Sequence, residues 1–312
     1  MLTRERSIHE DSANRVHFPD RPDLSGALLA PAQAEERKSA RHKESASWNF
    51  DSFGDWFQEM GEGLADTFSG PRRTAAPFKW TGKIAAGKTF EVRGINGKMR
   101  ATTASGPEVE LVAIRSGRRN DPESVKIEVV PHAGGVTVCA VYPSRDAARP
   151  NECKPGGGHM NTRNNDVNVE FELRIPKDVN FEGRTVNGSI EADIEGRAAL
   201  STVNGRIEVV AGTLTEATTV NGSIQAEVKS AANPADDIKL STVNGSVHLS
   251  LPEDVNADVS AKTVNGGITS EFTEIEVRKK WGPRSAEGRL GHGGRELELA
   301  TVNGGIRITK GN

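Results

Sequence analysis

This sequence is short of the residues that build helical cores and membrane spans. Only 5% of its 312 residues are aromatic, with a single tyrosine, and there are two cysteines. No apolar run approaches the roughly 18 residues that a membrane-spanning helix needs. An excess of one charge is also missing, since 40 basic residues stand against 43 acidic ones. We therefore expect no nucleic-acid partner and no transmembrane segment.

Glycine, by contrast, is abundant, with 33 residues. Many glycines and few aromatic residues are typical of short strands joined by tight turns. The composition therefore favours an all-β fold over a helical one.

The first 70 residues differ from the rest. Residues 1–47 mix charges of both signs without an apolar period, which predicts a disordered tail. Within it, Ala32-Gln33-Ala34 resembles a secretory cleavage site, but the apolar stretch before it is short and acids precede it. Residues 48–70 predict a short amphipathic helix, either a cap on the main domain or a docking helix for a partner. A cap is favoured because repeat arrays need covered ends. Its apolar positions are Phe53, Trp56, Phe57, Met60, Leu64 and Phe68.

One phrase, Thr-Val-Asn-Gly, recurs six times in the second half of the chain, and a looser copy begins at Gly94. The Asn-Gly pairs are Asn96-Gly97, Asn187-Gly188, Asn204-Gly205, Asn221-Gly222, Asn244-Gly245, Asn265-Gly266 and Asn303-Gly304. Apolar and polar residues alternate on both sides of each pair, as in Ile190-Glu191-Ala192-Asp193. This period of two predicts half-buried strands joined by Asn-Gly turns, with positive φ at Gly188, Gly205 and Gly222.

The spacing of the repeats distinguishes two architectures. Successive asparagines of the six phrases lie 17, 17, 23, 21 and 38 residues apart, and the last gap suggests a unit without its phrase. A meander would not require identical turns. In a β-solenoid, identical corners stack about 4.8 Å apart and their asparagines can form a hydrogen-bonded ladder. We therefore predict a β-solenoid with two short strands per coil over residues 78–312, irregular in 78–180 and regular in 181–312.

The serial phrases, with the preceding "NNDVNVEFELRIPKDVNFEGRTVNGSIEADI" and the opening "WTGKIAAGKTFEVRGINGKMRA", resemble the bacterial "putative adhesin" family, a domain of unknown function. The resemblance covers about residues 80–310. It implies a β-solenoid that envelope or exported proteins usually carry, and it implies no catalytic residues.

Few residues suggest chemistry. Cys139 and Cys153 could form a disulfide, which would indicate an oxidising compartment, or bind zinc together with His159. Glu191, Asp193 and Glu195 share an outward strand face, as the acids of a carbohydrate-active solenoid would, but aromatic sugar platforms are missing. The column of repeat threonines could bind ice if exposed, or pack inward.

We therefore expect a non-enzymatic structural or interaction protein without cofactor or metal. Its partner would be a protein or glycan surface, and an extracytoplasmic location is favoured. The alternatives are a carbohydrate-active enzyme and a cytoplasmic, self-assembling scaffold like the bactofilins.

Overall fold

The computed structural model describes residues 71–146, 148–157, 160, 162, 164–229, 236–278 and 282–311. The predicted tail, its Ala32-Gln33-Ala34 site and the predicted helix at 48–70 lie outside these residues. Within them, regular structure is β apart from one 3-10 turn, Pro122–Ser124. None of the described helical structure is long or apolar enough to span a bilayer.

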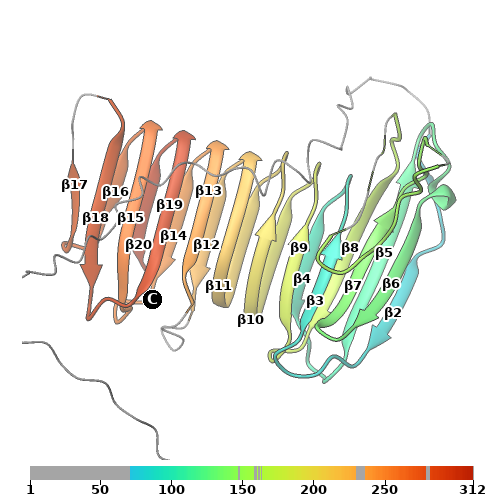
Figure 1. The fold of residues 1–312 in the computed structure, drawn as a ribbon, viewed down its shortest axis with the longest axis horizontal. Coiled ribbons are helices and arrows are strands. Elements are labelled where there is room, and N and C mark those ends of the chain that lie inside the picture. The colour runs from blue at the N-terminus through green and yellow to red at the C-terminus, as the bar shows by residue number, and fades with distance from the viewer. Residues whose placement is uncertain are drawn as a thin grey trace, which may run out of the picture. The chain divides into compact units, whose positions relative to one another are not determined.

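The Asn-Gly corners join two layers of strands (Figure 1). Strands that enter a corner form the entry layer, and strands that leave it form the exit layer. The entry layer contains β3 (Thr89–Arg93), β7 (Gly135–Val141), β9 (Asn180–Arg184), β13 (Ile238–Asn244), β15 (Ala257–Asn265) and β19 (Arg295–Asn303). The exit layer contains β4 (Met99–Thr103), β8 (Asn168–Ile175), β12 (Ile224–Val228), β14 (Val247–Leu251), β16 (Ile268–Ser270) and β20 (Ile306–Lys310).

Two longer strands, β10 (Ile190–Ser201) and β11 (Ile207–Asn221), run from the exit layer into the entry layer of the next coil. They bend near Gly196 and Gly212, where a β-carbon would lie within 3 Å of backbone oxygens of the neighbouring coil. All the strands are therefore hydrogen-bonded into one continuous, folded sheet.

Stacked strands of successive coils are parallel and in register. In the six Thr-Val-Asn-Gly repeats, the aliphatic residue two positions after each corner glycine pairs with its equivalent in the next coil, and every one is buried. These residues are Ile190, Ile207, Ile224, Val247, Ile306 and Ile268. The core lies between the two layers, and the β-solenoid predicted from the repeat is confirmed.

The order of the coils differs from the order of the sequence at both ends. The first coil, β3–β4, lies between β7–β8 and the later coil formed by β9 and β10. The last coil, β19–β20, lies between β13–β14 and β15–β16.

The interpretation of the 38-residue gap as a missing unit is therefore wrong. Asn265 and Asn303 belong to adjacent coils, because β15 and β19 pair directly in parallel. The intervening segment forms β17 (Ile275–Arg278) and β18 (Arg284–Leu290). β18 pairs antiparallel with β15, and β17 pairs antiparallel with β18, so the two strands finish that end of the entry layer.

The opposite end also finishes in antiparallel strands. In the exit layer, β5 (Val109–Gly117) pairs with β8, and β1 (Arg73–Thr74) and β2 (Phe78–Gly82) pair with β5. In the entry layer, β6 (Lys126–His132) pairs with β7.

Candidate functional site: the corner ladder and a polar groove

The corner asparagines form a continuous hydrogen-bonded ladder along the solenoid. Each side-chain Nδ2 donates to Oδ1 of the asparagine in the adjacent coil, at 2.8 or 2.9 Å. In spatial order, the ladder runs through Asn96, Asn187, Asn204, Asn221, Asn244, Asn303 and Asn265. At its start, Asn96 donates to the carbonyl of Asn165. Six side-chain hydrogen bonds therefore tie the coils together outside the backbone ladders.

The corner glycines are required for a different reason than the sequence suggested. The prediction of positive φ at Gly188, Gly205 and Gly222 is wrong, and of the corner glycines only Gly97 has one, at 125°. Instead, a β-carbon at Gly205 would lie 2.0 Å from the carbonyl oxygen of Gly188, and one at Gly222 would lie 1.9 Å from that of Gly205. Close stacking of backbone on backbone, not left-handed conformation, excludes side chains here.

The repeat threonines point inward and satisfy those same glycine carbonyls. Thr202 Oγ1 donates to Gly188 O at 2.9 Å, and Thr242 Oγ1 donates to Gly222 O at 2.8 Å. The six threonines of the phrase are almost completely buried. They therefore do not present the exposed flat array that an ice-binding surface needs.

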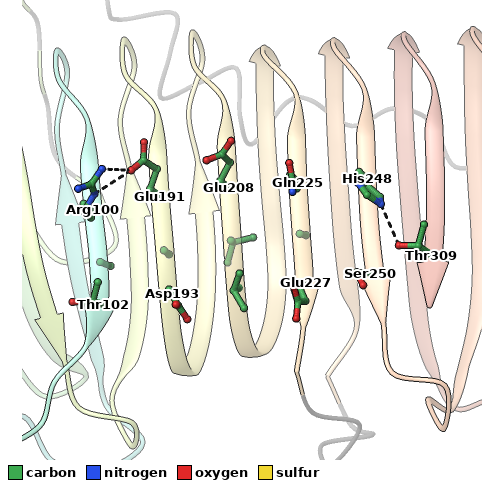
Figure 2. Close-up of a pocket in the computed structure, with 15 residues that line it drawn as sticks. Arg100, Thr102, Glu191, Asp193, Glu208, Gln225, Glu227, His248, Ser250 and Thr309 are labelled. Carbon is green, nitrogen blue, oxygen red and sulfur yellow. Dashed lines mark hydrogen bonds and ion pairs between the residues drawn. The ribbon is translucent and has the colours of Figure 1, made fainter. Parts of the chain in front are cut away.

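The outer face of the exit layer is hollowed into a shallow groove of about 550 Å³ (Figure 2). Parallel register sets its outward-facing side chains, most of them polar, in two rows that cross β4, β10, β11, β12 and β14, with Thr309 of β20 at one end. The row nearer the corner contains Arg100, Glu191, Glu208, Gln225 and His248, and the second contains Thr102, Asp193, Val210, Glu227 and Ser250. Both rows follow from the alternation of each strand, because every second residue faces outward.

The groove is acidic and its acids are largely paired. Arg100 Nη2 contacts Glu191 Oε2 at 2.7 Å. The hydrogen bond and charge of Arg100 lower the pKa of Glu191 and keep it ionised. Lys229 Nζ lies 2.9 Å from Asp193 Oδ1, and Arg206 Nη1 lies 3.1 Å from Glu208 Oε1. At the far end, His248 Nε2 and Thr309 Oγ1 are 3.1 Å apart.

Glu191 does not match the general acid of a glycosidase. A glycosidase needs a carboxylic acid whose pKa is raised, whereas the pKa of Glu191 is lowered. The residues that line the groove include Glu191 and Asp193 but not Glu195, and none of them is Trp, Tyr or Phe. The groove therefore presents hydrogen-bonding groups and ion-paired carboxylates at its surface.

Cys139 of β7 and Cys153 are joined in a disulfide. Bonded sulfurs cannot act as zinc thiolates, which removes the zinc hypothesis for them, and His159 lies outside the described residues. Among the described residues, no cluster of three or more His, Cys, Asp or Glu side chains could hold a metal ion.

Arg93 and Glu91 form a buried ion pair beside the disulfide, which the sequence did not predict. Arg93 Nε donates to Glu91 Oε1 at 2.7 Å, and Thr137 Oγ1 donates to Glu91 Oε2 at 2.9 Å, with all three side chains buried. In the sequence, Glu91 and Arg93 alternate with apolar residues, a pattern that is typical of a solvent-exposed strand face. The two residues lie beside the loop that the disulfide closes because Arg93 pairs with Cys139 across β3 and β7, and this pairing cannot be seen in the sequence.

Stacked two-stranded coils with a buried apolar centre define the class of this protein as a β-solenoid. Residues 187–309 match the profile of the family described as Toastrack DUF4097. This match confirms the family resemblance over the regular repeats.

Three solved structures that match the chain differ widely from it in sequence. A putative cell adhesion protein from Clostridium sporogenes has 13% identity and a TM-score of 0.45, over 76% of this chain and 100% of that one. A putative adhesin from Bacteroides fragilis has 10% identity and a TM-score of 0.35, over 80% and 100%. A putative lipid binding protein from Parabacteroides distasonis has 9% identity and a TM-score of 0.23, over 76% and 97%. No curated protein matches the chain.

Proposed function

We propose that this protein is a non-enzymatic, adhesin-like binding scaffold, and that the groove on the exit layer contacts its partner. The observation that carries this proposal is the groove itself, a fixed array of polar side chains on a cross-linked frame. Neighbouring side chains within a row are held one strand apart by both the backbone ladders and the asparagine ladder. Such a frame loses little conformational freedom when it binds, and that favours affinity.

The charge of the groove restricts the partner. Four carboxylates, from Glu191, Asp193, Glu208 and Glu227, line it, and Arg100, Lys229 and Arg206 form ion pairs with the first three in turn. With four carboxylates against these three cations, the groove offers no surplus of positive charge to an anionic polymer or lipid surface. A neutral or basic protein or glycan surface of the cell envelope suits this chemistry.

The disulfide supports a location outside the reducing cytoplasm, because disulfides persist in oxidising compartments and are rare in cytosolic proteins. This favours an exported scaffold over a cytoplasmic, self-assembling one. Fractionation of the producing cell with maleimide labelling tests it. We expect the chain in an extracytoplasmic fraction without a reactive thiol, and recovery of a reduced chain in the cytosol would contradict the assignment.

Co-sedimentation with envelope fragments of the producing cell tests the groove. We expect the wild type to sediment with the fragments and the double variant Glu191→Lys/Glu208→Lys to remain in the supernatant. Glu216→Lys/Glu298→Lys is the matched control, because both residues lie on the entry layer, in β11 and β19. Equal sedimentation of all three proteins, or none by the wild type, would refute the proposal. Glycan cleavage that Glu191→Gln abolishes would establish the enzymatic alternative.

A further inference from the structure

The two ends of the solenoid core are closed to different extents. At the C-terminal end, the segment after β16 folds over the core and buries Phe272 and Ile275, which are 4% and 5% exposed. Lys310 Nζ lies 5.5 Å from the centroid of the Phe272 ring and covers it further. Val277 of β17 stays half-buried there, so the chain's own residues cover most of this end.

At the opposite end, apolar side chains of the last strands face the core but stay partly exposed. Phe78 and Trp80 of β2 pair with Ala113 and Leu111, and both partners are buried. Trp80 also stacks on the buried ring of Phe90, with centroids 5.8 Å apart. These rings therefore pack against the core and remain half-exposed.

The entry layer ends in the same way. Ile127 and Val129 of β6 pair with Ala140 and Val138, which are buried, yet Ile127 and Val129 are only half-buried. Figure 1 places β2 and β6 together at this end of the stack. Phe78, Trp80, Ile127 and Val129 form what we call the open end.

We propose that residues 53–68 of this same chain cover the open end as a cap. The described chain begins at this end, since Arg73 and Thr74 of β1 pair with Gly117 and Ser116 on β5, the strand that also holds β2. The residues before Arg73 therefore join the described chain beside the open end.

The sequence of that segment fits the surface. Its six apolar residues, Phe53, Trp56, Phe57, Met60, Leu64 and Phe68, recur at helical spacing. Sixteen helical residues extend about 24 Å, which exceeds both the roughly 10 Å between layers and the roughly 17 Å of a five-residue strand. One helix is therefore long enough to cover all four open-end side chains.

Two other occupants fit less well. Stacking of a second copy would extend the sheet from β6, but this edge strand contains Pro131, which cannot donate to a ladder. A membrane surface would meet the acidic positions Asp55, Glu59, Glu62 and Asp66 on the other face of the segment.

Thiol labelling of the full chain tests the cap. The chain has only two cysteines and they are bonded, so an introduced cysteine is the only free thiol. Val129→Cys places the probe at the open end. Lys79→Cys on β2, whose side chain is exposed and faces away from the core, is the matched position that the cap leaves free.

We expect maleimide to modify Val129→Cys at least tenfold more slowly than Lys79→Cys. The rate at which maleimide modifies Val129→Cys should rise to that of Lys79→Cys when the apolar face is disrupted. Two changes disrupt it, the combined substitutions Trp56→Glu, Phe57→Glu and Leu64→Glu, and the removal of residues 1–70. Glu59→Gln/Glu62→Gln on the polar face should leave the Val129→Cys rate slow. Protection that survives the Glu substitutions and increases with protein concentration would show that a second copy is the occupant, and would overturn the proposal. So would protection that appears only with phosphatidylglycerol vesicles, or equal rates in all variants.

Discussion

The side-chain amide of Asn303 donates to Oδ1 of Asn244 at 2.8 Å, although 59 positions of sequence separate the two residues. Asn265 lies between them in the chain but outside them in the stack, where it donates to Asn303. The ladder therefore follows spatial order, and each inner asparagine both donates and accepts once.

Loss of an inner rung should be measurable. Asn204→Ala removes the bonds to Asn187 and from Asn221, and we expect it to lower the free energy of unfolding by about 1–2 kcal/mol. Asn265→Ala at the end of the ladder removes one such bond and should have about half the effect. Urea unfolding curves measure both values. Equal losses for the two variants would contradict the ladder as a source of stability.

A methyl group at an inner corner should be poorly tolerated. We expect Gly205→Ala to lower the free energy of unfolding by about 3 kcal/mol or more, because the new β-carbon would collide with Gly188 O. Gly106→Ala is the matched control, since no atom lies within 4 Å of its β-carbon position. Thermal melts that coincide for the two variants would disprove close stacking at this corner.

The disulfide should raise the free energy of unfolding because it closes a loop. Cys139→Ala/Cys153→Ala is expected to lose about 3 kcal/mol of unfolding free energy, as a loop of about fifteen residues predicts. Dithiothreitol should destabilise the wild type by a similar amount and leave the double variant unchanged. An effect of dithiothreitol on the double variant would point to a cause other than this bond.

Stability should fall in acid partly through Asp166. Burial by itself would raise the pKa of this carboxyl, but backbone N–H groups of Asn120, Arg119 and Arg118 donate to it and hold the pKa below its ordinary value of 3.8. A lowered folded-state pKa gives stability that is full above the unfolded value and is lost as pH falls through the folded one. Asp166→Asn should therefore flatten the decline in stability below about pH 4. Superimposable pH profiles for variant and wild type would rule out this contribution.

Much of the repeat could be predicted because the same four residues recur with alternating neighbours. The stacked corners and inward threonines follow from that pattern. The order of the coils could not be predicted, because Asn265 and Asn303 belong to identical phrases and local sequence does not show which one stacks on Asn244. The role of the glycines was also hidden, since Asn-Gly is equally typical of a turn with positive φ and of a corner that another backbone approaches.

The groove was only partly predictable. Strand alternation placed Glu191 and Asp193 on an outward face. Their neighbours Glu208, Gln225 and His248 join them only through the register between strands. The open end was not visible in the sequence either, because Phe78 and Trp80 read as ordinary core positions of a strand.

The interleaved coils at both ends limit how such an array can change its length in evolution. Between β9 and β14, sequence order and stacking order coincide, so duplicating one unit there would add a coil and keep every existing neighbour. Duplicating the final unit would instead place two copies in competition for the single position between β13–β14 and β15–β16. Longer and shorter relatives should therefore differ in the middle of the chain, while the interleaved ends keep their number of strands.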